Sequence, residues 1–330
     1  MIFKCSNCGG NIVYNAVKKK MCCPHCDSVD SQHKVTGEQS SLHSCINCGA
    51  PVSVSDYTSA APCEHCGCYL IFDERVEGQY RPHLMIPFGV SKEKAKEIMR
   101  ERFKKKAFTP SNFLEDNMLE KMTGMYVPFF LYDINVRCDY HAEGTKRRTW
   151  TSGNTEYTET SYYDVTRDMY VDFDKIPVDA SIAMDDSVMD LMEPYNYGAL
   201  EDFKEEFMSG FYGEMYNSDG DSLRPRAKKK AVDNAETMLR ESLAGYNSLR
   251  VIHKNTYTQD NATNYTLMPV WHYKYSYGGK SYDYYINGQT GKAVGRTPVS
   301  KAKLLGYGAT VWGLLAILMA AVKLLMDSGF

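Results

Sequence analysis

The sequence lacks a large net charge and an apolar opening. Its 330 residues include 38 Lys and Arg against 41 Asp and Glu, so the net charge is only −3. A charge this small creates no overall field that would attract nucleic acid. The chain opens with Met1-Ile2-Phe3-Lys4 and reaches its first cysteine at once, so we expect no secretory signal peptide.

Nucleotide-binding and catalytic motifs are also missing. Gly279-Lys280-Ser281 resembles the end of a phosphate-binding loop, but Lys274 stands where the upstream glycine is required. We therefore expect no ATP-driven motor. The eight histidines are scattered and form no recognisable Ser/His/Asp or Cys/His pattern, so we expect that the protein is not an enzyme. The alternative, an enzyme with its site in a Tyr-rich cleft, has no candidate residues.

Cysteine, by contrast, is abundant and ordered. Eight of the 11 cysteines form one pattern written twice, in which two CxxC pairs are separated by 14 residues and each cysteine recurs 40 positions later. This spacing is typical of tetrahedral four-cysteine zinc sites, which are structural because four sulfurs close the coordination shell. The sequence therefore predicts two structural Zn²⁺ ions, the first held by Cys5, Cys8, Cys23 and Cys26 and the second by Cys45, Cys48, Cys63 and Cys66.

The metal would supply the stability that these units lack. A repeat of 40 residues is too small to bury a core, whereas zinc binding contributes on the order of 10 kcal/mol per site. A disulfide framework is the alternative, although a cytosolic chain favours metal. His25 and His65, at equivalent places in the second pairs, could each replace a ligand. Cys22 and Cys68 flank the sites as spare thiols, and Cys138 is expected in a strand core.

The predicted fold class is α+β, with a body of mixed antiparallel sheet and helices. Composition and motifs divide the chain into five parts: a zinc ribbon at 1–34, a second zinc ribbon at 35–72, a polar linker at 73–83, the α+β body at 84–300 and an apolar transmembrane helix at 304–322.

Hydrophobic periodicity places the elements of the body. Helices are expected at 92–106 with Ser91 as N-cap, 114–122, 185–192, 199–212 and 226–242. Strands are expected at 84–88, in hairpins over 127–171 with turns at 143–144 and 152–154, and at 249–256, 265–277, 280–286 and 292–295. Segment 127–144 resembles 268–285, and each follows a basic helix, so we expect two related halves.

The C-terminal segment is the only long apolar run. Its 19 residues at 304–322 carry no charge and would span about 28 Å as a helix, close to the hydrocarbon thickness of a bilayer. Lys292, Arg296, Lys301 and Lys303 precede it, which places the soluble part in the cytoplasm. We therefore expect a tail-anchored protein of the cytoplasmic membrane. A buried or amphipathic helix is the alternative, but its glycines would weaken it in water.

Small residues recur every three or four positions along this segment. They are Gly306, Ala309, Gly313, Ala316 and Ala320. Such a face predicts self-association or pairing with another membrane protein. An equally good explanation is that Gly and Ala are common in membrane helices.

The two predicted ribbons differ in charge. Residues 1–34 have five Lys against two Asp, hence +3, whereas residues 35–72 have no Lys or Arg and three acids, hence −3. A paired nucleic-acid reader should be basic throughout, so the difference favours protein contact. Ribbon one alone, with Lys18, Lys19 and Lys20, could still contact anionic lipid or nucleic acid.

Five motifs outside the cysteines carry a resemblance: TGMYVPFFLYD (123–133), AEGTKRRTW (142–150), FDKIPVDASIAMDD (173–186), PVW (269–271) and NGQTGKAVG (287–295). With the tandem ribbons and the hydrophobic tail, the chain resembles, over nearly its whole length, a family of bacterial zinc-ribbon membrane proteins. Members are often labelled primosomal-helicase-like or transcription-factor-IIB-type zinc-ribbon proteins, but this chain has no helicase motor.

Relatives in that family tend to be associated with phage-shock-type and flotillin-like membrane proteins, so the resemblance implies an anchor or scaffold in envelope stress. Only the eight zinc cysteines carry over. We therefore expect a membrane-tethered adaptor that recruits partner proteins at the cytoplasmic face. The alternative is a membrane-associated nucleic-acid-binding protein without helicase activity.

Overall fold

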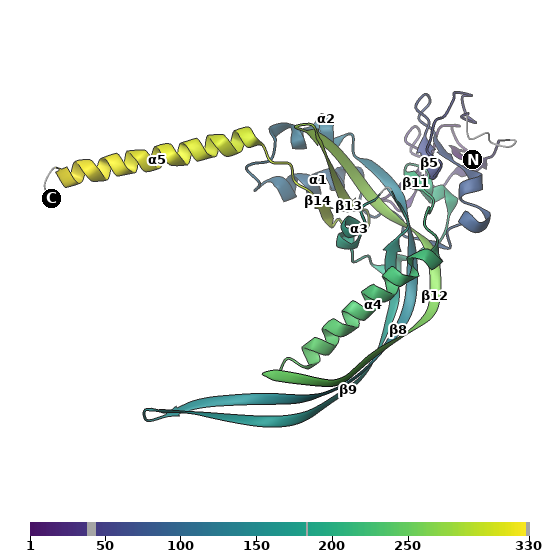
Figure 1. Ribbon diagram of the computed structural model, residues 1–330. Helices are drawn as coiled ribbons and strands as arrows, with labels where there is room; N and C mark the ends of the chain where they lie inside the picture. The colour runs from purple at the N-terminus through teal and green to yellow at the C-terminus, as the bar shows by residue number, and fades with distance from the viewer. Residues whose placement is uncertain (38–43, 183, 328–330) are drawn as a thin grey trace.

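The computed structural model describes residues 1–37, 44–182 and 184–327. Its body contains a ten-stranded sheet and short helices, and two long projections leave this body toward the same side (Figure 1). One projection is an arm of β-strands, and the other is the C-terminal helix α5 (Lys301–Asp327). The molecule therefore has the outline of a C, and the predicted α+β class is confirmed.

Two long neighbouring strands form the centre of the sheet. β8 (Thr123–Ser152) and β12 (Ser248–Tyr277) pair antiparallel, with Val127 opposite Met268. The two similar segments found in the sequence are thus adjacent in one sheet, and their first residues face each other. The shorter strands that flank this pair are β7 (Leu84–Met85), β10 (Glu201–Asp202), β11 (Tyr212–Glu214), β13 (Lys280–Asn287) and β14 (Ala293–Gly295).

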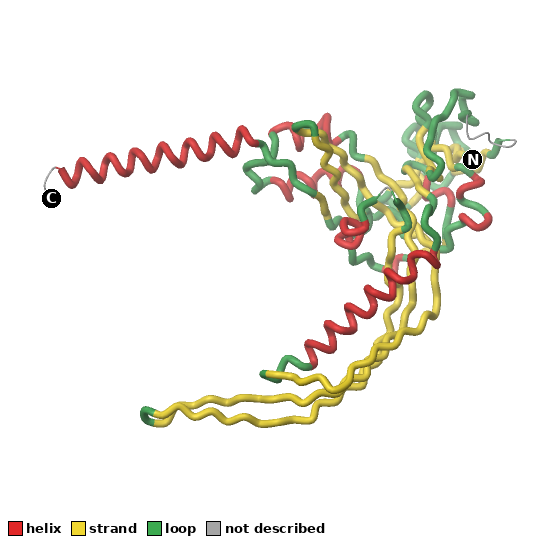
Figure 2. Tube along the Cα trace, viewed as in Figure 1, coloured by secondary structure: helices red, strands yellow, loops and turns green. Residues whose placement is uncertain are grey.

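The arm consists of the far ends of β8 and β12 together with β9 (Thr155–Asp179), which pairs with β8 down to the turn at 152–154. Figure 2 shows that the arm is almost entirely strand. Irregular pairing occurs between Tyr132 and Ile134 and between Asp260 and Ala262. Bulges of this kind bend a strand, which accounts for the curvature between body and arm.

Helix α4 (Gly220–Ser242) lies along the concave side of the arm (Figure 1). Its buried face repeats a small residue every four positions: Ala227, Ala231 and Ala235. Small side chains at that spacing let the helix axis approach the strands closely. In the second turn of the helix, Arg226 donates to Asp179 at 2.9 Å, and this ion pair connects α4 to the end of β9.

Short helices close the body. α1 (Lys92–Phe103) begins as predicted, with the Ser91 hydroxyl accepting from the Lys94 amide, and ends three residues before the predicted limit. α3 (Asp186–Met192) is capped in the same way by Asp185. The helix expected at 114–122 is instead divided into η3 (Ser111–Leu114) and α2 (Asp116–Leu119).

Three further predictions about the body were wrong. Segment 199–212 is not a helix but a series of short turns and strands, including η4 (Tyr197–Ala199) and η5 (Glu205–Met208). The strands at 249–256 and 265–277 are one continuous β12. The turn at 143–144 is instead the interior of β8, where a Cβ on Gly144 would lie 2.7 Å from the Tyr246 ring. This glycine permits close packing and makes no turn.

Residues 1–37, here named module 1, carry the first four-cysteine set. They form two small sheets, one of β1 (Ile2–Cys5) with β4 (Gln32–Val35) and one of β2 (Val13–Asn15) with β3 (Lys20–Cys22). The second set lies in residues 44–72, here named module 2. Its strands β5 (Thr58–Pro62) and β6 (Tyr69–Ile71) are the last two of the ten-stranded sheet, followed by η1 (Asp73–Arg75) and η2 (Gly78–Tyr80).

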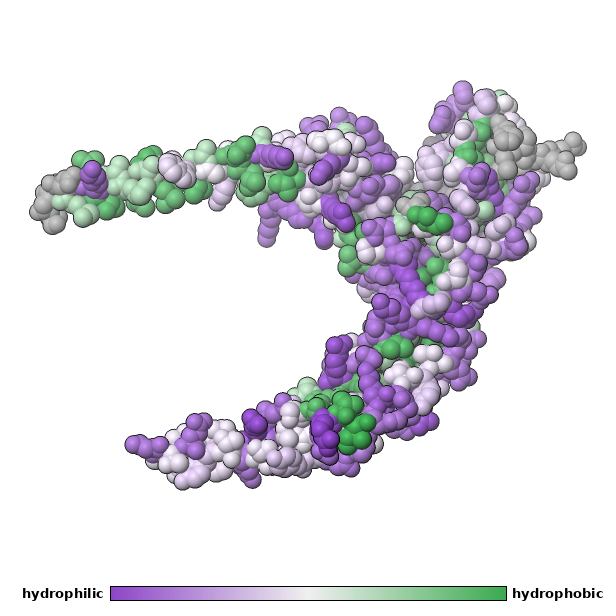
Figure 3. Space-filling view, in the orientation of Figure 1, coloured by the Kyte–Doolittle hydropathy of each residue, from purple (hydrophilic) through white to green (hydrophobic). Residues whose placement is uncertain are grey.

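Helix α5 is apolar and projects from the body (Figure 3). Over residues 301–324 it is long and apolar enough to cross a membrane, and none of that span is buried. Among the described residues it is the one helix that meets these criteria. A helix of this kind is a candidate membrane span by length and composition.

Candidate metal centres

Each CxxC pair forms the same tight hairpin. At Cys5 the backbone amide donates to Gly10 at 2.8 Å, and the amide of Gly9 donates back to Cys5 at 2.8 Å. The same two bonds recur at Cys23, Cys45 and Cys63. The fifth residue of each hairpin has a positive φ of 56° to 72°, and three of the four are the glycines Gly9, Gly49 and Gly67. Asp27 is the fourth.

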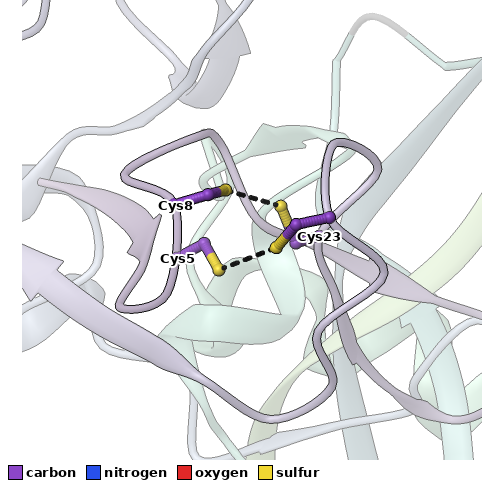
Figure 4. Close-up of side chains that lie close together, drawn as sticks. Cys5, Cys8 and Cys23 are labelled. Atoms are coloured by element: carbon purple, nitrogen blue, oxygen red, sulfur yellow. Dashed lines mark hydrogen bonds between the residues drawn. The ribbon is translucent and has the colours of Figure 1, made fainter.

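The hairpins bring the predicted ligands together in two groups. In each group all four sulfurs lie within 4.8 Å of one another. In module 1 the Cys5–Cys26 and Cys8–Cys23 sulfur distances are 3.7 Å and 3.5 Å, and the Cys5, Cys8 and Cys23 thiols converge in Figure 4. In module 2 the two equivalent distances are 3.7 Å and 3.8 Å.

These distances fit a metal and do not fit disulfides. A tetrahedron with Zn–S bonds of about 2.3 Å has sulfur–sulfur edges of about 3.8 Å, whereas a disulfide requires about 2.05 Å. The cysteines of the described residues are free thiols. Two four-cysteine groups that could hold metal ions are therefore present where they were predicted.

The close thiols of module 1 affect one another's pKa. The Ser31 hydroxyl lies 3.4 Å from the Cys5 sulfur and lowers the pKa of that thiol to about 6. A hydrogen bond from the Gly10 backbone lowers the pKa of Cys8, but the neighbouring Cys26 and Cys23 together with burial outweigh it and raise that pKa to about 12. Four thiols this close cannot all ionise alone, and a divalent cation removes that obstacle.

Asn7 and Asn47 support the cysteine groups and were not predicted from the sequence. The Asn7 amide lies 3.6 Å from the Cys26 sulfur, and the Asn47 amide lies 3.3 Å from the Cys66 sulfur. Hydrogen bonds of this kind orient metal ligands and tune their affinity. The sequence could have predicted both, since each residue precedes the second cysteine of a CxxC pair and the two are 40 positions apart.

One difference between the two groups lies at Ser28 of module 1 and the equivalent Cys68 of module 2. In module 1 the Ser28 hydroxyl lies 3.1 Å from the Cys26 sulfur. In module 2 the corresponding residue is Cys68, whose buried sulfur lies 3.5 Å from Cys45 and 3.3 Å from Cys66. Burial, followed by these two neighbours, raises the pKa of Cys68, so it is a neutral thiol beside the four predicted ligands.

The remaining sequence candidates lie elsewhere. His25 and His65 are exposed and belong to neither group of sulfurs, so ligation by histidine is not supported. Cys22 is buried in β3. Cys138 is fully buried in β8, which confirms that it is a core residue.

Both modules pack against each other and against the body. The Met1 amino group donates to the Ile71 carbonyl at 2.6 Å, and the Ile2 side chain packs in the core of module 2. Module 1 meets the body where the Ser209 hydroxyl donates to the Ile12 carbonyl at 2.7 Å and the Tyr14 amide donates to the Ser209 carbonyl at 2.8 Å. The modules are therefore joined to the rest of the protein by buried contacts.

A cavity of about 650 Å³ lies between module 1 and the body. Its walls include the rings of Tyr14 and Phe88 and the ion pair of Lys204 with Glu201, at 3.1 Å. Burial and the nearby Glu201 raise the pKa of Tyr14 to about 12, so its hydroxyl is neutral. The cavity has the size of a small-molecule site.

The small residues of α5 lie on an exposed helix. A Cβ added at Gly306 or Gly313 would meet nothing within 4 Å. The face predicted for helix pairing is therefore open along the described part of α5.

These features define a class of protein: two four-cysteine centres joined to an α+β body that ends in a candidate membrane-spanning helix. A curated protein of Bacillus subtilis (strain 168), called uncharacterized protein YdjG, is 33% identical over 338 residues, which cover 99% of each chain. The chain therefore belongs to the YdjG family. No family model matches the chain, and no solved structure matches it.

Proposed function

We propose that this protein is a membrane-tethered adaptor that recruits partner proteins at the cytoplasmic face of the membrane. In this proposal each four-cysteine group holds one structural Zn²⁺, as the tetrahedral sulfur distances suggest. Helix α5 crosses the bilayer, and Lys301 and Lys303 on its N-terminal side favour a cytoplasmic body. A reducing cytoplasm would also keep the thiols able to bind metal.

The observation that carries the proposal is the arm. Among the described strands, β9 pairs with β8 alone, so its other edge has no strand partner, and only near its end does Lys230 of α4 donate to the Pro177 carbonyl. Tyr162 and Tyr170 on this strand are 81% and 61% exposed. An open edge and exposed aromatic side chains are typical of surfaces that bind another chain by strand addition.

The arm is a better recognition surface than the modules. Module 2 uses β5 and β6 to extend the body sheet, and module 1 buries Ile12 and Tyr14 against Ser209. Their surfaces are thus partly occupied by internal contacts. We propose that the partners are other membrane proteins, with phage-shock-type and flotillin-like proteins favoured by the family resemblance and envelope stress as the setting.

A shortened arm tests this function. The variant has residues 147–160 replaced by Asn-Gly, a two-residue hairpin turn that rejoins Lys146 to its partner Ser161, and has the exposed Tyr162 and Tyr170 changed to Thr. We expect partners captured from solubilised membranes by the full chain to be lost from this variant. The matched control substitutes Lys18, Lys19 and Lys20 with Gln in module 1 and should retain them.

The opposite pattern would reject the arm as the recognition surface. If the lysine variant loses its partners and nuclease treatment has the same effect, nucleic-acid binding through module 1 is the better function. Of these lysines, Lys20 is already paired with Asp30 at 2.9 Å, which leaves Lys18 and Lys19 for a ligand. No catalytic activity is part of the proposal.

A further inference from the structure

The base of α5 is held by a loop from a distant part of the sequence. The Ser300 amide donates to the Phe108 carbonyl at 2.8 Å, and the Lys303 ammonium donates to the Thr109 carbonyl at 2.8 Å. The Phe108 ring also meets the Tyr307 ring edge to face, with centroids 5.5 Å apart. Loop 104–110 is therefore level with the first turns of α5.

This loop brings a basic cluster to the same place. Lys104, Lys105 and Lys106 are exposed, and Lys105 has no ion pair or hydrogen bond with the described residues. Within the described part of the chain, the Lys104 ammonium has only a 3.7 Å contact with Glu101, and the Lys106 ammonium donates to the Thr297 hydroxyl at 3.0 Å. Figure 3 shows hydrophilic side chains gathered where the apolar helix joins the body.

Two further lysines complete the cluster. Lys301 and Lys303 begin α5, and Lys301 is exposed without a partner among the described residues. Loop 104–110 and residues 296–303 contain no Asp or Glu. We name the five side chains the lysine collar: Lys104, Lys105, Lys106, Lys301 and Lys303.

We propose that the lysine collar binds the anionic headgroups of the bilayer leaflet at which α5 enters the membrane. The inference rests on the proposed membrane span of α5. The apolar helix α5 begins at Lys301, beside loop 104–110, so a lipid surface is the ligand that meets the lysines at this level. Phe108 and Tyr307 are aromatic residues at the same level, as is typical of the membrane interface. Lysines near an anionic surface each add to the attraction.

Headgroup binding would also orient the body. Loop 104–110 follows α1 directly, and Phe103 at the end of α1 is buried in the body core. The membrane would thus hold the body at a second element in addition to α5. A protein attached by one helix can rotate freely, whereas attachment at two elements restricts it.

The experiment uses the full chain in a neutral detergent, with phosphatidylglycerol or phosphatidylcholine added as the probe and bound lipid counted by native mass spectrometry. Substitution of Lys104, Lys105 and Lys106 with Gln should lower the affinity for phosphatidylglycerol by about tenfold to a hundredfold. The control carries the same charge change at Lys18, Lys19 and Lys20 in module 1 and should bind as the native chain does.

Two results would overturn the inference: equal binding of both lipids by the native chain, or an equal loss in both triple variants. Competition with inorganic phosphate distinguishes a simple anion site, because free phosphate should not displace the lipid from an extended collar. The span itself is tested separately by alkaline extraction of membranes. A chain that resists extraction but shows no headgroup preference would reject the collar alone, whereas a chain that is extracted would reject the span and, with it, the collar.

Discussion

Modules 1 and 2 share one cysteine frame but have different places in the fold. Module 1 forms two sheets of its own, and backbone hydrogen bonds and buried side chains attach it to module 2 and the body. Module 2 instead supplies β5 and β6 to the ten-stranded sheet, where β5 pairs with β11 and β11 pairs with β8. The repeated spacing determines how the sulfurs are arranged, and the residues between them determine where each centre is placed.

The consequence is clearest at the hairpin of Cys63 to Cys68. This hairpin directly connects β5 to β6, with Pro62 opposite Tyr69. A metal bound there would fix the turn of a strand pair that belongs to the main sheet. In module 1 the equivalent hairpin follows β3, which pairs only with β2 among the described strands. Loss of metal from module 2 should therefore also destabilise the main sheet, whereas loss of metal from module 1 should destabilise that module alone.

The largest expected effect comes from removing one ligand in each module. We expect two zinc equivalents in the native chain, one after Cys5→Ser and one after Cys45→Ser combined with Cys68→Ser. A structural zinc site contributes on the order of 10 kcal/mol, so the affected module should unfold in each case. Metal analysis measures the first result, and hydrogen exchange followed by mass spectrometry measures the second.

Hydrogen exchange should distinguish the two variants. The module 2 variant should lose protection in β11 and the adjoining part of β8, whereas the Cys5→Ser variant should retain it. Equal hydrogen exchange in the body of both variants would show that both modules affect the main sheet to the same extent, which would contradict the proposed difference.

The second prediction concerns the extra thiol of module 2. Because Cys68 lies 3.5 Å from Cys45 and 3.3 Å from Cys66, it can take the place of a missing thiolate. We expect Cys45→Ser alone to retain two zinc equivalents but to release one faster to a chelator than the native chain does. Cys68→Ser alone, which gives module 2 the serine of module 1, should retain both at the native rate. Complete loss of one equivalent from Cys45→Ser would show that Cys68 cannot substitute.

The sequence predicted the two four-cysteine groups well because their geometry is local. CxxC hairpins are set by adjacent residues, and a fixed spacing is enough to bring two of them together. Asn7 and Asn47 could have been added from the same repeat. The position of each module could not be predicted, since it depends on pairing between β5 and β11, which are far apart in the chain.

The arm was harder to predict from the sequence for a similar reason. Residues 257–264 are polar and were therefore predicted to separate two strands, yet they are paired with β8 across a bulge. Gly144 read as a turn because close packing by Tyr246 and Val165 is not visible in sequence. Long-range partners thus decided both segments, whereas the N-cap Ser91 depends on adjacent residues and was predicted correctly.

The third prediction compares the two asparagines. Asn47→Ala should weaken zinc binding by module 2 about tenfold or more, as expected for a lost hydrogen bond to a ligand. Asn7→Ala should have a smaller effect, because the Ser28 hydroxyl remains 3.1 Å from the Cys26 sulfur and can still donate to it. Competition with a chromogenic chelator measures both affinities. A larger loss from Asn7→Ala would contradict the ranking.

The smallest expected effect is at the contact between module 1 and the body. Ser209→Ala removes the donor to the buried Ile12 carbonyl and should cost about 1–3 kcal/mol of docking free energy. The Tyr14 amide keeps its bond to the Ser209 carbonyl, so the module should loosen without unfolding. We expect faster hydrogen exchange at residues 12–14. The zinc content and the hydrogen exchange of β5 and β6 should be unchanged. The control is Ser53→Ala in module 2, whose hydroxyl has no hydrogen bond with the described residues. Faster exchange in β5 and β6 after Ser209→Ala would mean that module 1 supports the sheet edge, and the two modules would then be one cooperative unit.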